Sequence, residues 1–268
     1  MSAADAPLLD VWVEGDTPLL IDAPHAGTYI PEALRAALTP HAQNVADTDW
    51  HVPQLYAFAI ERGVGLMSAT HARYVIDLNR DPQGAALYPG ADNSELVPST
   101  GFDSAPLYLP GCAPDAAEID ARRALYWAPY HARLAQRLAA IRNRHGYAIL
   151  LDAHSIRSRV PRFFDGRLPD LNLGTADGHS CAASLQAAAF ELLNQAKGFS
   201  AVCNGRFKGG YIARHYGRPA QGTHALQLEI AQACYMHEDP PWPWDPRRAQ
   251  PLQGVLRRLV DRLLDWRP

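Results

Sequence analysis

Short apolar runs alternate with longer amphipathic segments along the chain. The short runs predict buried strands at residues 18–24, 74–80, 148–151 and 225–230, the last with polar Gln227 and Glu229 on one face. Helical periodicity predicts long helices at about 116–145, where Pro129 would favour a kink, at 180–196 and at 251–264. Shorter helices are expected from Pro31 and after Asp47, which resembles a helix N-cap. This order predicts an α/β fold, a three-layer sandwich around a mixed, mostly parallel sheet.

Two stretches lack any regular pattern. Residues 82–114 are rich in Gly, Pro, Ser and Asp, and such a long irregular segment is typical of a functional loop or lid. Residues 240–246 contain too many prolines for a helix or a central strand and predict a rigid surface connection. With 268 residues and no internal repeat, the chain is expected to form a single domain.

Composition narrows the classes of partner. The net charge of −3 and the spread of the arginines argue against nucleic-acid binding, and no apolar run reaches the roughly 20 residues that span a bilayer. Residues 1–7 lack the features of a secretory signal, so a cytoplasmic location is expected. The four cysteines form no C-x-x-C pair and are expected to be reduced thiols. A small-molecule substrate remains, and nothing indicates the oligomeric state.

Candidate metal ligands follow the predicted strands. His25 and His154 each stand at a strand end, where open α/β sheets bind ligands. A catalytic zinc site takes three protein ligands and keeps a fourth position for water, so both histidines are predicted ligands and Asp49 is the candidate third. The alternative for His154 is a hydrogen-bonded structural histidine. The sequence does not show whether the two histidines meet.

Three polar residues beside these candidates are predicted to support them. Asp47 either lies near the site or only caps a helix, and Asp152 either orients His154 or only caps a strand end. Ser155 follows His154 directly, but no G-x-S-x-G nucleophile elbow occurs, which argues against a serine hydrolase. The glycine-containing segment 205–210 lacks the ending of a phosphate-binding loop and is expected to be a mobile turn.

Glu229 is the candidate general base. Amide hydrolysis at a metal site needs a carboxylate beside the attacking water, and Glu229 is an acid in an otherwise apolar strand, where burial would raise its pKa. The alternative is an exposed glutamate on the solvent face of a half-buried strand.

Several arginines are suited to bind substrate carboxylates. Arg80 presents a planar fork of donors beside the amide of Asn79, although it could instead form a surface ion pair with Asp77 or Asp81. Arg157 and Arg214 belong to two further arginine groups, and either could bind a second carboxylate.

Five short motifs together resemble the N-formylglutamate amidohydrolase family over residues 18 to about 235. They are Pro24-His25-Ala26-Gly27, Asp47-Thr48-Asp49-Trp50, Asp77-Leu78-Asn79-Arg80, Leu151-Asp152-Ala153-His154-Ser155 and Leu226-Gln227-Leu228-Glu229. The resemblance implies the phosphorylase/hydrolase-like fold of the zinc carboxypeptidases. It also implies cleavage of N-formyl-L-glutamate to formate and L-glutamate, the last step of one histidine degradation route.

A weaker resemblance to the zinc carboxypeptidases suggests individual roles. Those enzymes have a metal-binding His-Ser pair similar to His154-Ser155 and an Asn-Arg pair that holds the substrate carboxylate. They also have a mobile tyrosine after a Gly-Gly pair, similar to Tyr211, and a general-base glutamate in a late strand. Their H-x-x-E metal motif is not matched, because Thr28 stands three residues after His25. The carboxylate ligand therefore stays open between Asp49 and another acid.

The resulting hypothesis is a metal-dependent deformylase. Glu229 would take a proton from a metal-bound water that attacks the formyl carbon, with zinc favoured although iron, cobalt or nickel also suit two imidazoles and a carboxylate. The substrate would be an N-formylated dicarboxylic amino acid. The alternatives are a related acylamino-acid hydrolase or carboxypeptidase-like peptidase, and a non-catalytic carboxylate-binding domain.

Overall fold

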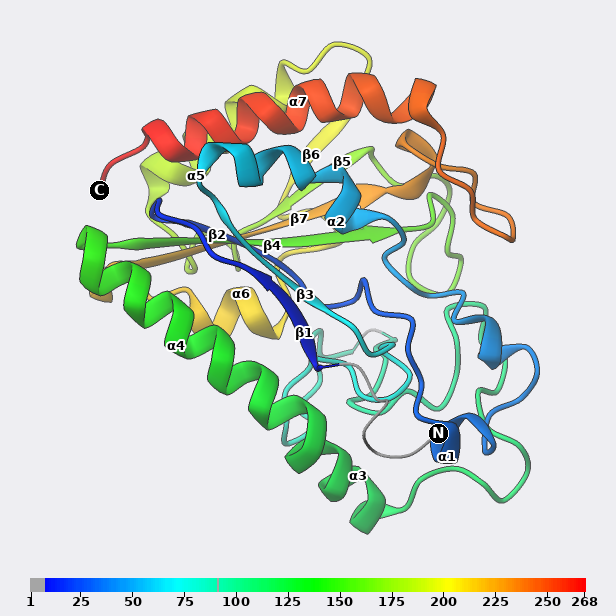
Figure 1. Cartoon of the computed structure of the whole chain (residues 1–268). Helices are drawn as coiled ribbons and strands as arrows, with labels where there is room; N and C mark the ends of the chain where they lie inside the picture. The colour runs from blue at the N-terminus through cyan, green and yellow to red at the C-terminus, as the bar shows by residue number, and fades with distance from the viewer. Residues whose placement is uncertain (1–7, 91) are drawn as a thin grey trace.

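A seven-stranded sheet forms the centre of the computed structural model, which describes residues 8–90 and 92–268 (Figure 1). Strands β3, β2, β4 and β7 are adjacent and parallel, whereas β1 and β5 pair antiparallel with β3 and β7. This mixed, mostly parallel sheet confirms the predicted fold class. In spatial order the strands are β1 (Asp10–Val13), β3 (Gly65–Ala69), β2 (Leu19–Ala23), β4 (Ala148–Ile156), β7 (Thr223–Ala231), β5 (Leu171–Gly174) and β6 (Ala201–Cys203).

Helices cover both faces of the sheet (Figure 1). One face carries α2 (Val52–Leu55), α5 (Ala183–Asn194) and α7 (Pro246–Asp265), and the other carries α4 (Ala128–His145) and α6 (Tyr211–Tyr216). The predicted helix 116–145 is present as α3 (Ala116–Arg122) and α4, joined by a π-helical turn (Arg123–Trp127) that ends two residues before Pro129. The remaining helical elements are α1 (Glu32–Arg35) and the 3-10 turns Ala42–Asn44, Ala57–Arg62, Pro219–Gln221 and Gln232–Cys234.

Side chains of the central strands are buried on both faces, which explains their continuous apolar runs. Successive residues of a strand point to opposite faces, so Leu150 packs with the core under α4 while Leu151 packs with the core under α7. Leu20 and Ile21 of β2 divide between the two cores in the same way. A polar side chain in such a strand is therefore buried in either orientation.

The prediction of a strand at residues 74–80 is wrong. This segment is buried but irregular, because both edges of β2 are already paired with β3 and β4. Its backbone groups find other partners: Asp77 N–H donates to Leu96 O (2.7 Å), and the Arg122 guanidinium donates to Val75 O (3.2 Å). The strand that fills this position in the sheet is β3, which the apolar pattern did not predict.

Two helix starts also differ from the sequence prediction. Helix α2 begins only at Val52 after His51, and Asp47 does not cap it. Helix α7 begins at Pro246 instead of residue 251, because the Asp245 carboxylate accepts hydrogen bonds from the amides of Arg247 and Arg248. Proline at the first helical position needs no N–H partner there.

The remaining sequence-based expectations have different outcomes. The described residues between 82 and 114 contain no helix or strand, whereas their role as a lid and the single-domain organisation stay predictions. All four cysteines are free thiols, as expected. In the part of the chain that the structure describes, no helix has the length and apolar character needed to cross a membrane. The leader prediction for residues 1–7 lies outside the described residues.

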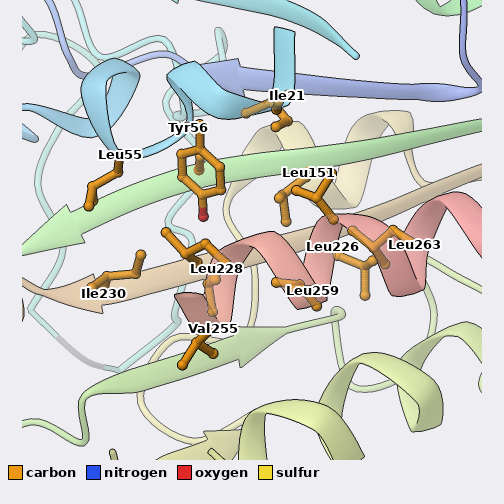
Figure 2. Packing of buried hydrophobic residues seen from close by; sticks show 14 of the residues in the cluster. Ile21, Leu55, Tyr56, Leu151, Leu226, Leu228, Ile230, Val255, Leu259 and Leu263 are labelled. Atoms are coloured by element: carbon orange, nitrogen blue, oxygen red, sulfur yellow. The ribbon is translucent and has the colours of Figure 1, made fainter. Parts of the chain in front are cut away.

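Replacing Tyr56 with phenylalanine is expected to stabilise the protein. The Tyr56 ring is fully buried among Leu228, Ile21 and their neighbours, and its hydroxyl has no hydrogen-bond partner among the described residues (Figure 2). An unsatisfied buried hydroxyl costs about 1–3 kcal/mol, which the variant would recover. Chemical denaturation of both proteins measures the difference, and a less stable Tyr56→Phe variant would contradict the expectation.

Candidate active site

The candidate site lies at the carboxyl ends of three adjacent parallel strands. His25 follows β2, His154 lies near the end of β4, and Glu229 near the end of β7. The register of β4 with β7 pairs His154 with Glu229, so the two side chains leave neighbouring strands on the same face. The chain leaves β2 for β3 on one side and later returns to β4 on the other, and such a switch point is where open α/β sheets bind ligands.

His25, Asp49 and His154 form a buried group that could hold a metal ion. One ligand atom from each residue lies within 4.8 Å of the others, and the two imidazole centroids are 4.8 Å apart. Asp49 lies in the loop before α2. The Asp49 amide donates a hydrogen bond to His25 O (3.0 Å), which anchors this loop beside His25. The tertiary structure therefore brings together the three ligands predicted from separate segments.

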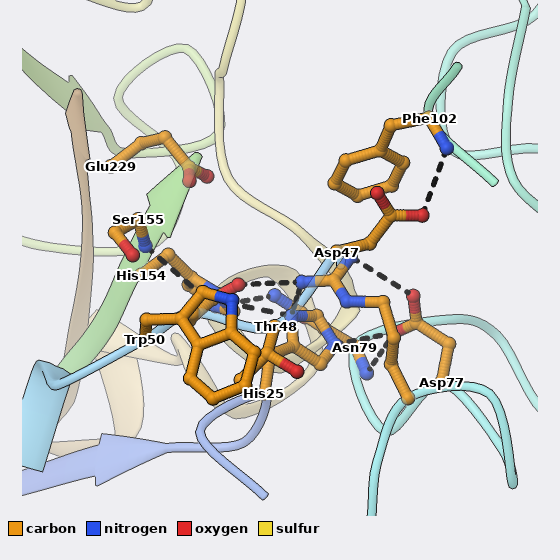
Figure 3. Close-up of polar contacts among 12 residues, drawn as sticks. His25, Asp47, Thr48, Trp50, Asp77, Asn79, Phe102, His154, Ser155 and Glu229 are labelled. Atoms are coloured by element: carbon orange, nitrogen blue, oxygen red, sulfur yellow. Dashed lines mark hydrogen bonds and ion pairs between the residues drawn. The ribbon is translucent and has the colours of Figure 1, made fainter. Parts of the chain in front are cut away.

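Each histidine has one ring nitrogen held by a buried carboxylate, and Figure 3 shows Asp77 beside His25. Asp77 Oδ1 accepts from His25 Nε2 at 2.7 Å, and Asp152 Oδ1 accepts from His154 Nε2 at 2.8 Å. These contacts turn the opposite nitrogen, Nδ1, of each ring toward Asp49. A carboxylate behind each imidazole is the arrangement that fixes the ring and raises its basicity at metal sites.

Arg73 is a buried cation within this group. Its guanidinium donates to Asp49 Oδ1 (2.7 Å) and to His25 Nδ1 (2.6 Å), and it packs over the Phe102 ring at 4.9 Å. Burial alone would raise the pKa of Asp49, but Arg73 and the two histidines outweigh it and lower that pKa. For His25, burial and then Arg73 lower the pKa, which keeps the imidazole neutral as a metal ligand requires.

Two buried carboxyl groups, Asp22 and Asp152, lie close together near His154. Asp22 and Asp152 are neighbours in the register of β2 with β4, and both are fully buried. Burial, then repulsion from Asp152, raises the pKa of Asp22 to about 8, and Tyr130 Oη donates to Asp22 at 2.5 Å. Asp22 is therefore mostly neutral at pH 7. Although burial lowers the pKa of His154, Asp152 and Asp49 together raise it well above its usual value.

Glu229 is buried, not exposed on a solvent face. Its side chain lines the same pocket as His25 and His154 and lies beside His154 (Figure 3). Burial raises the pKa of Glu229 to about 8. At pH 7 the Glu229 carboxyl, like that of Asp22, is then mostly protonated, but with a pKa this close to neutrality it can exchange a proton in either direction, which general acid–base chemistry requires.

Asn79 and Arg80 lie beside the group of His25, Asp49 and His154, and both are oriented by hydrogen bonds. Asn79 Nδ2 donates to Asp152 Oδ2 (3.1 Å) and lies 2.9 Å from His154 Nε2, while its Oδ1 accepts from the Ile212 amide (2.7 Å). Arg80 lines the pocket and donates from Nη2 to Ser94 Oγ (2.7 Å) and from Nε to Ser94 O (3.0 Å). These bonds hold the Arg80 guanidinium at the pocket wall, with Asp77 no closer than 4.0 Å.

Comparison with known proteins assigns the family. Residues 17–236 match the family model described as N-formylglutamate amidohydrolase. The chain belongs to this family. The N-formylglutamate deformylase of Pseudomonas aeruginosa is 48% identical over 252 residues, and that of Pseudomonas putida 47% identical over 253, with 94% of both chains covered in each case. The resemblance seen in five short motifs is thus confirmed over most of the chain.

Solved structures show the same architecture. The crystal structure of N-formylglutamate amidohydrolase from Ralstonia eutropha superposes with a TM-score of 0.78 at 27% identity, covering 95% of this chain and 97% of that one. A gene product of Agrobacterium tumefaciens superposes with a TM-score of 0.71 at 18% identity, covering 96% and 94% of the two chains, and shows the shared fold alone.

The structure separates the other predicted site residues of this N-formylglutamate amidohydrolase family member into two groups. Asp152 contacts His154, and the Ser155 amide donates to Asp49 Oδ2 (3.2 Å), so both residues touch the group of candidate metal ligands. Arg157, Tyr211 and Arg214 do not line the pocket that contains Glu229. Arg157 lies near Asp47 (3.5 Å), and Tyr211 stacks on His215, so their substrate-binding roles stay predictions.

Asp47 holds the irregular segment 82–114 against the site instead of capping a helix. Its Oδ2 accepts from Tyr74 Oη (2.8 Å) and from the Phe102 amide (2.8 Å). Because the Phe102 ring packs under the Arg73 guanidinium, Asp47 positions a wall of the pocket.

Sequence reasoning missed four residues of this family member's site. Arg73 and Asp77 stand four residues apart in a largely apolar stretch, a signal that could have indicated a buried ion pair. Gln227 lines the pocket and accepts from the Gly210 amide (2.6 Å), which its place two residues before Glu229 could have suggested. Arg206 also lines the pocket, and no pattern in the sequence distinguishes it from other arginines.

Proposed function

We propose that this protein hydrolyses the amide bond of N-formyl-L-glutamate to give formate and L-glutamate. Its relatives are named for that activity, and it shares their family. The observation that carries the proposal is the grouping of His25, Asp49 and His154 beside Glu229 in one pocket. A role in histidine degradation and a cytoplasmic location follow as part of the proposal.

The donor set fits a divalent metal. Two imidazoles and a carboxylate, all buried, match the ligands of catalytic zinc, and Asp77 and Asp152 supply the carboxylates behind the imidazoles. One imidazole nitrogen of His25, one of His154 and a carboxylate oxygen of Asp49 would hold it. When bound, zinc would lower the pKa of a water molecule and polarise the formyl carbonyl.

The protein's own groups supply the proton transfers and the remaining charge stabilisation. Glu229 accepts a proton from the attacking water and returns it to the leaving nitrogen, so that the C–N bond breaks to give formic acid and a neutral amine. The acid then passes its proton to the amine, which leaves formate and the ammonium form of L-glutamate. The Arg73 guanidinium, fixed by Asp49 and packed on Phe102, would stabilise negative charge that develops on the carbonyl oxygen.

The α-carboxylate of the substrate would bind Arg80. Its guanidinium is oriented by Ser94 at the pocket wall, and Asn79 beside it holds Asp152 and the backbone of residue 212. A preoriented guanidinium binds a carboxylate with less loss of side-chain entropy than a mobile one.

Formate release from a series of N-acyl glutamates tests this function. N-Formyl-L-glutamate should be hydrolysed, with kcat/KM at least about 10-fold above that of N-acetyl-L-glutamate or a peptidyl-glutamate, since one extra group in a fitted pocket is worth roughly this factor. Faster cleavage of the larger acyl groups would instead identify a related acylamino-acid hydrolase or peptidase. Substrate binding without turnover by metal-loaded protein would identify a non-catalytic binding domain.

A further inference from the structure

Arg206 lies in the active-site pocket with its terminal donors unused. Its Nε donates to Phe163 O (2.6 Å), and no hydrogen bond or ion pair from its two Nη atoms occurs among the described residues. A nearby carboxylate, Asp92, has both oxygens bound by Arg162, at 3.0 Å each, and although Arg162 and then the Arg206 charge lower its pKa, Asp92 forms no hydrogen bond with Arg206. An unpaired guanidinium in a pocket favours an anionic ligand.

The guanidinium of Arg206 is also held in position. Its central carbon lies 5.0 Å from the Tyr88 ring centroid, 5.8 Å from Phe163 and 5.5 Å from Phe207. Three rings around one planar cation restrict its rotation and reduce its contact with water, which strengthens an ion pair formed there. The same rings offer apolar walls for the methylene groups of a substrate side chain.

The backbone on both sides of Arg206 is anchored. Asn204 bonds the end of β5 through Oδ1, which accepts from the Thr175 amide at 2.8 Å. Lys208 N–H donates to Tyr88 Oη (3.0 Å), and Lys208 O accepts from the Ala176 amide (2.6 Å). Residues 205–210, predicted from the sequence to form a mobile turn, are therefore held by hydrogen bonds on both sides of Arg206.

Three arginines line the pocket, and each has a different environment. Arg73 is bound to Asp49 and His25, and Arg80 is oriented by Ser94. Only Arg206 of the three has no bond from its Nη atoms to the described residues. A substrate with two carboxylates needs a second cation besides Arg80, and Arg157 and Arg214 do not line this pocket.

We propose that Arg206 binds the distal (γ) carboxylate of the substrate and is the residue that selects a dicarboxylic N-formyl amino acid. This inference rests on the proposed function, because it assigns one end of the same substrate. Arg206 acts by charge and shape recognition, and it takes no part in breaking the amide bond.

The test compares three substrates in wild type and in Arg206→Gln. N-Formyl-L-glutamate carries both carboxylates, N-formyl-L-glutamine replaces the γ-carboxylate by a neutral amide, and N-formyl-L-isoglutamine replaces the α-carboxylate. In Arg206→Gln, kcat/KM on N-formyl-L-glutamate should fall about 10- to 100-fold, the usual worth of a charged hydrogen bond, with little change on N-formyl-L-glutamine. The preference for N-formyl-L-glutamate over the isoglutamine substrate should persist.

The matched control is Lys208→Gln, which removes a positive charge from the same loop. The Lys208 ammonium is partly exposed and pairs with Asp177 at 3.2 Å, away from the pocket lining. Selectivity between the glutamate and glutamine substrates should remain that of wild type in Lys208→Gln. If Arg206→Gln is poorly folded, Arg206→Lys keeps the charge and the chain length but lacks the planar fork, and it should retain part of the selectivity.

The outcomes separate this inference from the proposed function. Equal loss on both the glutamate and glutamine substrates, or wild-type selectivity in folded Arg206→Gln and Arg206→Lys, would overturn the role of Arg206 while leaving the deformylase function intact. Collapse of selectivity in Arg214→Gln or Arg157→Gln instead would transfer the role to that arginine. A wild-type protein that releases formate from none of the three substrates would reject the proposed function and the inference together.

Discussion

Replacing Glu229 with glutamine should lower kcat about 1,000-fold, within the range of a lost general base, while KM changes less than about threefold. Glutamine has the same shape but cannot accept the proton of the attacking water at neutral pH. Because the substrate carboxylates are expected to bind elsewhere in the pocket, substrate affinity should survive. Steady-state formate release measures kcat, and calorimetric titration of the inactive variant with N-formyl-L-glutamate measures binding.

Glu61→Gln provides the control for this variant. Glu61 is exposed in the 3-10 turn before β3 and does not line the pocket, so its replacement removes one carboxylate outside the site. Glu61→Gln should have wild-type kcat. A Glu229→Gln protein with full activity would show that the proton acceptor is another group, while loss of both binding and turnover would assign Glu229 to substrate binding or to the integrity of the site.

Removing the metal should abolish activity. Activation of water and polarisation of the carbonyl account for several kcal/mol of barrier lowering at zinc sites, so chelation should reduce kcat at least about 1,000-fold. Addition of about one equivalent of Zn²⁺ should restore activity. Elemental analysis of the purified protein identifies the native ion among zinc, iron, cobalt and nickel, and chelation should also lower the unfolding temperature because the metal binds the folded state preferentially.

A ligand variant connects this result to the residues. His154→Ala should lower both the bound metal and the activity, whereas His179→Ala, at an exposed histidine on the loop after β5, should affect neither. Metal-free protein that retains the full rate would reject the metal mechanism. Normal metal content in His154→Ala with lost activity would instead show that His154 is not a metal ligand, and it would contradict the proposed site of His25, Asp49 and His154.

The contrast between β4 and the segment 74–80 shows where local pattern succeeds and where it fails. Both read as apolar, β-favouring runs that end in polar residues. Both edges of β4 are free to pair, and they pair with β2 and β7. Residues 74–80 cannot join β2 in the same way, because its two edges are already paired with β3 and β4. Sheet membership depends on which edges are free, and neighbouring residues in the sequence carry no information about that.

The site divides in a similar way. The sequence by itself determined the α/β class, the strand ends that carry His25, His154 and Glu229, and the family, because apolar periodicity and short motifs are local properties of the chain. The tertiary structure alone decided that β2, β4 and β7 are neighbours, that Asp49 reaches both histidines, and that Asp77 and Asp152 hold the rings. It also decided which arginines line the pocket: Arg206 is brought there by a loop anchored to β5 and Tyr88, while Arg157 and Arg214 are not. These outcomes follow from strand order and loop packing between segments far apart in the sequence, where the energetic choice is made by burial and by pairing of buried charges.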